Sequence, residues 1–109
     1  MISLIEERRA EIESLCRRYG VLRLDLFGSA ATDTFDAATS DLDFIATFAE
    51  TEKPGYARRY LGFAEALEAL FNRPVDLLTE RSIRNPYFRE NVEATRRTVY
   101  VERDASAVA

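Results

Sequence analysis

Two aspartates, Asp41 and Asp43, stand two residues apart in a stretch that is otherwise rich in Leu, Phe and Ile. Because successive side chains of a β-strand point to opposite faces, both carboxylates are expected on one face, with Cβ atoms roughly 7 Å apart. Two acids this close beside an apolar core raise each other's pKa unless a cation lies between them. Mg²⁺ is the cation that suits carboxylate oxygens beside phosphates. The pair therefore predicts a divalent metal site.

A Gly28-Ser29 dipeptide lies upstream of these acids, separated from Asp41 by eleven residues. The alternating run 22–27 before it predicts a strand, which Gly28 interrupts. Such a turn lets backbone N–H groups approach an anion closely. The alternative is that Ser29 serves as a helix N-cap, and the two interpretations are compatible. A phosphate-binding turn next to a metal-binding acid pair is the outline of a nucleotidyl-transfer site.

These residues resemble the signature of the DNA polymerase beta-like nucleotidyltransferase superfamily, which is an apolar residue, Gly, Gly or Ser, a spacer, and then acid–apolar–acid. The matching segments here are Phe27-Gly28-Ser29 and Asp41-Leu42-Asp43. Within the superfamily the chain looks most like the minimal nucleotidyltransferases, the antitoxin partners of HEPN-domain toxins. The resemblance continues through 73–78, which looks like the strand with a third carboxylate, Asp76, and 84–89, which resembles the closing helix.

The resemblance implies that two Mg²⁺ ions are held by Asp41 and Asp43 as shared ligands and by Asp76 as the third. Two such ions stabilise both the attacking and the leaving oxygen in nucleotidyl transfer. The structural alternative for Asp76 is a surface acid at a strand end. For Asp41 and Asp43 it is a solvated acid pair on an edge strand.

The nucleotide, expected to be ATP, is assigned to Gly28, Ser29 and Ser40. Gly28 permits the close turn, Ser29 contacts the β- and γ-phosphates, and Ser40 orients Asp41. The family pattern usually carries an arginine and a glycine shortly after the Gly-Ser pair, where this chain has Thr32 and Asp33. That exchange removes a cation from the triphosphate side, and Arg23, Arg73 or a partner's residue are the candidates to replace it.

The function implied by the resemblance is that of an antitoxin that transfers AMP from ATP to a hydroxyl, typically of a tyrosine, on a HEPN-type ribonuclease toxin. Two alternatives stay open. The chain neutralises its partner by binding alone, with a weak or vestigial site, or it transfers a nucleotide to a small molecule.

Length and composition limit the folds and functions that are possible for this chain. At 109 residues the chain is expected to form one domain, 1–109, with a frayed tail at 104–109. A net charge of −4 argues against a large nucleic-acid groove, so no direct nucleic-acid partner is expected. The absence of histidine excludes a Ser-His-Asp triad, and Cys16 is expected in the core. Neither a membrane span nor a secretory signal is visible, which favours the cytoplasm.

Hydrophobic periodicity predicts an α/β (α+β) fold in which helices pack on a small mixed sheet of three to four strands. Asp25 and the arginine pairs, including Arg96, are expected at the solvated surface. Phe88 is expected to pack in the core. The expected helices are 2–19, 56–71 and 86–95, and the expected strands are 22–27, 41–48 and 75–78, with 98–101 as an edge strand or tail.

Overall fold

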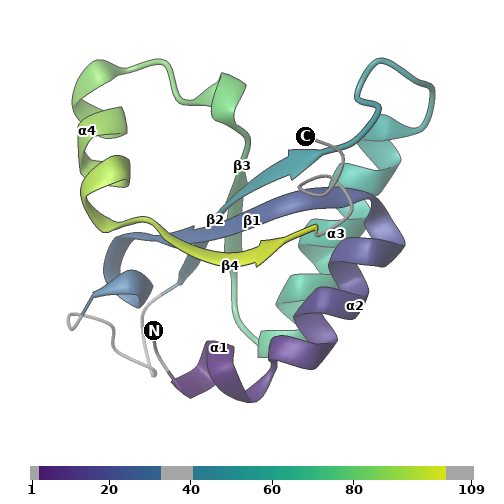
Figure 1. Cartoon of the computed structure of the whole chain (residues 1–109), viewed down its shortest axis with the longest axis horizontal. Helices are drawn as coiled ribbons and strands as arrows, with labels where there is room; N and C mark the ends of the chain where they lie inside the picture. Colours follow the sequence, from purple (N-terminus) through teal and green to yellow (C-terminus); the bar gives the residue numbers. More distant parts are fainter. Residues whose placement is uncertain (1–2, 33–40, 103–109) are drawn as a thin grey trace.

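The computed structural model describes residues 3–32 and 41–102, which form a four-stranded mixed sheet with helices on both faces (Figure 1). Three expectations from the sequence fall outside the described residues. They concern Ser40, which is assigned to the nucleotide, Asp33 and the tail at 104–109. The elements in chain order are α1 (Ser3–Glu7), α2 (Arg9–Tyr19), β1 (Val21–Phe27), η1 (Gly28–Ala31), β2 (Leu42–Phe48), α3 (Tyr56–Phe71), β3 (Val75–Leu78), η2 (Glu80–Ser82), α4 (Pro86–Thr95) and β4 (Arg97–Val101).

The strands are ordered β3-β2-β1-β4 across the sheet. β1 runs antiparallel to both β2 and β4, whereas β2 and β3 are parallel. The parallel pair is possible because α3 carries the chain back along the sheet between β2 and β3. The predicted fold class is confirmed, and the segment 98–101 is an edge strand, β4.

Each face of the sheet has its own apolar core. The larger core joins one face to α2 and α3, and it includes Leu24, Phe44 and Phe63. The smaller core lies under α4 on the opposite face and contains Phe27, Ile45, Ile83 and Val92. Figure 1 shows α2 and α3 together on one side of the strands and α4 on the other, at the upper left. Side chains along a strand alternate between the two faces of the sheet. Because Phe44 faces the larger core, the Asp43 side chain lies on the α4 face.

Local residues set the element boundaries. Gly20 and Asn72 end α2 and α3 in the left-handed conformation, with φ of 72° and 52°. The Asn85 side chain accepts hydrogen bonds from the N–H groups of Tyr87 and Phe88 and so caps the start of α4. The expected single helix 2–19 is wrong at one point, because Arg8 leaves the helical conformation and separates α1 from α2.

The expectation that Asp25 and Arg96 lie at the solvated surface is wrong. Asp25 is fully buried on β1, where the Arg96 guanidinium lies 2.8 Å and that of Arg23 3.1 Å from its carboxylate. Arg96 also pairs with Glu80 and Glu93, so that one side chain joins β1, η2 and α4. A buried carboxylate is tolerated when it is paired and hydrogen-bonded in this way.

Two further expectations concern Cys16 and the membrane. Cys16 is buried in the larger core, where desolvation raises the pKa of its thiol to about 12. A thiol with so high a pKa is a poor nucleophile.

Among the described helices, none has both the length and the apolar character needed to span a membrane.

We predict that Arg96→Ala lowers the free energy of unfolding by about 2–3 kcal/mol, because it leaves buried Asp25 with Arg23 as its remaining partner. Urea denaturation measures the change. Arg97→Ala is the matched control: Arg97 is exposed, and we expect a change below about 0.5 kcal/mol. Equal losses in the two variants would contradict the role given to the Arg96–Asp25 pair.

Candidate functional site

The sheet register brings the predicted turn and two of the predicted acids together. Asp43 lies opposite Phe27, the last residue of β1, and also opposite Asp76 on β3. Neighbouring strands are roughly 4.8 Å apart, so Asp43 stands between the Gly28 turn and Asp76. Asp41 precedes β2 and is exposed, as is Asp76. The site is therefore built at one end of the sheet, around the start of β2.

Gly28 permits the closest approach in the site. Its φ is +72°, and a Cβ atom at this position would lie 2.7 Å from the Asp43 Oδ2 atom. A side chain here would meet both backbone strain and a clash with the carboxylate. The Gly28 N–H donates a 3.0 Å hydrogen bond to Thr95 Oγ1 on α4. The turn is thus fixed by the strand on one side and by α4 on the other.

Ser29 lies inside the short helix η1 and is not its N-cap, which corrects the structural alternative. The N-cap is Phe27, in extended conformation and without a side-chain hydrogen bond. Ser29 is half-buried, and its hydroxyl makes no hydrogen bond to the described part of the chain. Thr32 ends η1 by donating from its N–H and hydroxyl to the Ser29 carbonyl.

The three carboxylates interact electrostatically. Burial, together with the negative charges of Asp76 and Asp41, raises the pKa of Asp43 to about 6. The sequence predicts such a rise for an acid held beside other acids near an apolar core. The register of β2 and β3 fixes Asp43 and Asp76 side by side in spite of their repulsion.

The donor set fits Mg²⁺ by chemistry, since it consists of carboxylate oxygens whose mutual repulsion a divalent cation would relieve. Within residues 3–32 and 41–102, however, no three acidic side chains converge closely enough to form a ready metal-ligand cluster. Asp43 and Asp76 are direct neighbours, whereas Asp41 is the exposed residue that precedes β2. The assignment of two metal ions to the three acids stays a prediction.

A cavity of about 380 Å³ opens beside Gly28 and Asp43. Its other wall is α4, which sequence reasoning did not assign to the site. Phe88 is 40% exposed there, which corrects its expected core position, and its ring packs edge-on against Phe27 at a centroid distance of 6.0 Å. The remaining lining residues are Asn91, Val92, Ala94 and Thr95. The Asn85-Pro86 helix start was the available signal for α4, but nothing in the sequence placed that helix against Gly28.

The two candidate replacement cations differ in position. Arg23 binds Asp25 and Thr98 and is therefore committed to the buried ion pairs. Arg73 is half-buried just before Pro74, whose carbonyl accepts the Leu42 N–H, so it lies at the same end of the sheet as Asp41. Arg73 is the better placed of the two to meet a phosphate.

The sequence of this chain is similar to those of known proteins. The model of the "Nucleotidyltransferase domain" family matches residues 9–99. A protein of Methanocaldococcus jannaschii named "Putative protein adenylyltransferase" is 37% identical over 76 residues, which cover 70% of this chain and 74% of that protein.

Solved structures support the same fold. A "putative minimal nucleotidyltransferase" superimposes with a TM-score of 0.68 and 32% identity, covering 88% of this chain and 95% of that one. A tri-AMPylated HEPN toxin of Shewanella oneidensis in complex with its MNT antitoxin gives a TM-score of 0.61 at 18% identity, covering 95% of this chain and 78% of that chain. A toxin–antitoxin structure with AMP-PNP gives 0.63 at 20% identity, covering 92% and 78%. The resemblance found in the sequence is confirmed.

We predict that Gly28→Ala destabilises the protein more than Gly55→Ala does. Both glycines have positive φ, but a Cβ at Gly55 meets nothing within 4 Å, whereas one at Gly28 meets the Asp43 carboxylate. The control therefore carries the backbone strain alone, about 1 kcal/mol, and Gly28→Ala adds the clash. Urea denaturation of both variants measures the difference, and indistinguishable losses would contradict the close approach.

We predict that Asp43→Asn makes the metal-free protein more stable at pH 7. Because the folded-state pKa of Asp43 is raised to about 6, the folded state holds its proton more tightly than the unfolded state. Stability from this group is present below pH 4 and is lost as the pH rises to about 6. The variant should lack that decline and gain about 1 kcal/mol at pH 7, a value discounted for the partial exposure of the group.

Denaturation in EDTA at pH 4 and pH 7 measures this. All other titratable side chains are the same in the two proteins, so the remaining pH dependence of stability is common to both. A variant whose stability falls between pH 4 and pH 7 as steeply as that of the wild type would contradict the raised pKa.

Proposed function

This chain belongs to the nucleotidyltransferase domain family, and from that premise we propose that it is a Mg²⁺-dependent protein adenylyltransferase that acts as an antitoxin. It transfers AMP from ATP to a hydroxyl, of a tyrosine in our proposal, on a HEPN-type ribonuclease toxin. The observation that carries the proposal is the position of Asp43 between the Gly28 turn and Asp76. A phosphate-binding turn and adjacent carboxylates are the two parts that the chemistry needs.

The geometry of the site supports the following proposed roles. The acceptor hydroxyl oxygen attacks the α-phosphorus of ATP, the bond to the β-phosphate breaks, and pyrophosphate leaves. Mg²⁺, when bound, lowers the pKa of the acceptor hydroxyl and neutralises charge on the phosphates. Asp41, Asp43 and Asp76 would hold it. The Ser29 hydroxyl and N–H would bind the β- and γ-phosphates, since the Gly28 N–H is already used by Thr95.

The cavity beside α4 provides the rest of the binding surface. Phe27 and Phe88 give it an apolar wall directly next to Asp43. A planar base or an aromatic acceptor side chain fits such a wall, because aromatic rings favour offset or edge-on contacts. Arg73 is the candidate cation for the triphosphate in place of the arginine that the family pattern has near Thr32.

The partner is proposed on the pattern of the similar proteins. The MNT antitoxin of Shewanella oneidensis was solved with a tri-AMPylated HEPN toxin, and another similar complex contained AMP-PNP. We propose the same kind of hetero-oligomer and the same nucleotide for this chain. The cytoplasm is the proposed compartment because ATP and ribonuclease targets are found there.

A second candidate function is neutralisation by binding alone. The observation in its favour is Thr32, which stands where the family pattern has an arginine and is engaged in closing η1. In that case the toxin is inhibited by occlusion, and the nucleotide site is too weak to act.

We predict that Asp41→Asn/Asp43→Asn abolishes AMP transfer without unfolding the protein. The experiment incubates a cognate HEPN toxin with Mg-ATP and this protein, and intact-mass spectrometry records one or more AMP additions on the toxin. Loss of the shared carboxylates removes the metal, so transfer should fall by at least about 100-fold. Glu65→Gln, an acid on the exposed surface of α3, is the matched control and should transfer normally.

Two outcomes would contradict the proposal that the carboxylates catalyse AMP transfer. Undiminished transfer by the double variant would remove the carboxylates from the chemistry. No transfer by either protein, together with equal protection of cells from the toxin, would favour neutralisation by binding alone.

A further inference from the structure

The outer edges of the sheet are closed by side chains. On β3 the Val75 N–H donates a 3.1 Å hydrogen bond to the Glu68 carboxylate, and the Leu77 carbonyl accepts the Tyr60 hydroxyl. On β4 the Val99 carbonyl accepts a 2.7 Å hydrogen bond from Arg9. Such caps prevent another strand from pairing with these edges.

The second half of β2 has no such protection. Its pairing with β3 ends at Ile45, opposite Leu78, so the last residues of β2, 46–48, continue beyond β3. The Leu42 N–H donates to Pro74 on the β3 side and the Ala49 N–H to Gly20 on the β1 side. Because backbone groups alternate along a strand, the N–H and carbonyl of Phe48 point to the side that β3 has left. In the described ranges, no hydrogen bond outside the sheet reaches these two groups.

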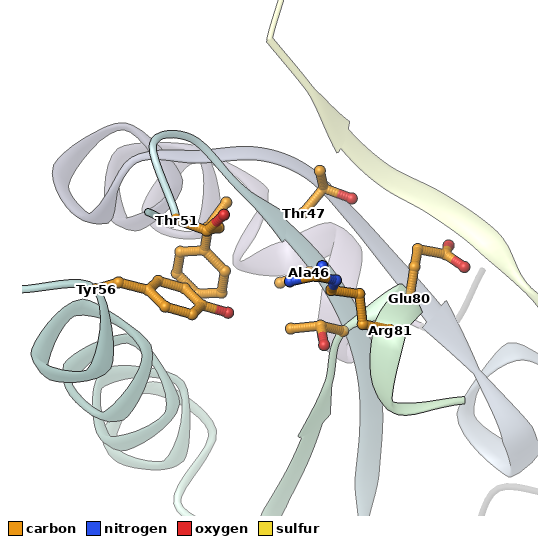
Figure 2. A pocket seen from close by; sticks show the side chains of 8 residues that line it. Ala46, Thr47, Thr51, Tyr56, Glu80 and Arg81 are labelled. Carbon is orange, nitrogen blue, oxygen red and sulfur yellow. The ribbon is translucent and has the colours of Figure 1, made fainter. Parts of the chain in front are cut away.

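A cavity of about 250 Å³ lies along this open stretch. Figure 2 shows that the Arg81 side chain extends toward Ala46, that the Tyr56 hydroxyl points into the cavity, and that Glu80 points away. Phe48 forms an apolar wall, and its ring packs edge-on against Tyr56 at 5.5 Å between centroids. Threonine hydroxyls complete the lining at positions Thr47, Thr51 and Thr79.

The charge at this cavity is positive and uncompensated. Arg81 is exposed, and within the described residues it makes neither an ion pair nor a hydrogen bond. Its neighbour Glu80 is already paired with Arg89 and Arg96, so that carboxylate is not available to it. An open strand edge, an apolar wall and a free guanidinium thus lie side by side.

We propose that an extended segment of the acceptor protein binds here as an added strand alongside the end of β2. Its backbone pairs with Phe48, an acidic side chain pairs with Arg81, and an apolar side chain packs on Phe48 and Tyr56. Strand addition draws affinity from backbone hydrogen bonds and specificity from alternate side chains. The acid is required by charge complementarity with Arg81, whose charge no described carboxylate offsets.

This inference rests on the proposed function in one respect, that the acceptor is a protein. It gives a short chain a means of holding a macromolecular substrate. Ala46 is three residues beyond Asp43 on the same strand, a separation of roughly 10 Å, so a segment docked here is held close to the transfer site without filling it.

The test uses the full chain, labelled with ¹⁵N, and needs neither ATP nor transfer. The probe is a terminally blocked pentapeptide of alternating valine and threonine with glutamate at its centre, titrated to 10 mM. We expect amide shifts centred on residues 46–48 and Arg81 and slower hydrogen exchange at the Phe48 amide. The same peptide with lysine in place of glutamate should bind about fivefold more weakly, the size of an exposed ion pair.

Charge reversal makes the test specific. Arg81→Glu should reverse the preference and favour the lysine peptide, whereas Arg84→Glu, an equal charge change on an exposed arginine that does not line the cavity, should leave it unchanged. Equal binding of both peptides, no shifts at 10 mM, or shifts centred on Gly28 and Asp43 would overturn the proposal. Shifts at 46–48 that grow with protein concentration without peptide would assign the edge to a second copy of this chain.

The two proposals fail independently. If the toxin gains no AMP but the peptide shifts appear, the transfer function is wrong and the docking edge stands. If transfer occurs and Arg81→Glu leaves both the peptide preference and the KM for the toxin unchanged, the docking edge is wrong.

Discussion

Repulsion between carboxylates that the sheet holds side by side is the constraint on which the site depends. Hydrogen bonding between β2 and β3 places Asp43 next to Asp76, and the pairing of β1 with β2 places Gly28 against Asp43. The register keeps the two carboxylates adjacent, so burial and this repulsion together raise the pKa of Asp43. A cation at this point would relieve the repulsion, which is the physical reason why such an arrangement suits metal-dependent chemistry.

The rest of the molecule supports that arrangement from two sides. The larger core fixes the sheet to α2 and α3 through the even-numbered residues of β2, and so directs Asp43 to the opposite face. On that face α4 supplies Thr95 for the Gly28 N–H and Phe88 for the cavity wall. The position of α4 depends in turn on Arg96, which ties its end to buried Asp25 and to Glu80.

Glu80 connects the two proposed binding regions of the protein. Its carboxylate belongs to the ion pairs beneath α4, while the next residue, Arg81, lies at the open edge of β2 and pairs with none of the residues that the structure describes. The proposed nucleotide site and the proposed docking edge thus use different ends of the same strand. A small protein can separate the binding of a nucleotide from the binding of a macromolecule in this way, since one strand offers both an end and an edge.

The sequence by itself determined the helices, the strands and the likeness to nucleotidyltransferases, because these depend on local signals. Hydrophobic periodicity located α3 and β3, Asn85-Pro86 marked the start of α4, and the Gly-Ser and Asp-Leu-Asp segments carried the resemblance. Tertiary structure alone decided that Asp25 is buried, that Thr95 holds Gly28, and that β3 ends before β2 does. The reason is distance along the chain. Asp25 and Arg96, or Gly28 and Thr95, are about seventy residues apart, and a charge or hydroxyl in a sequence gives no sign of the partner that folding will bring to it.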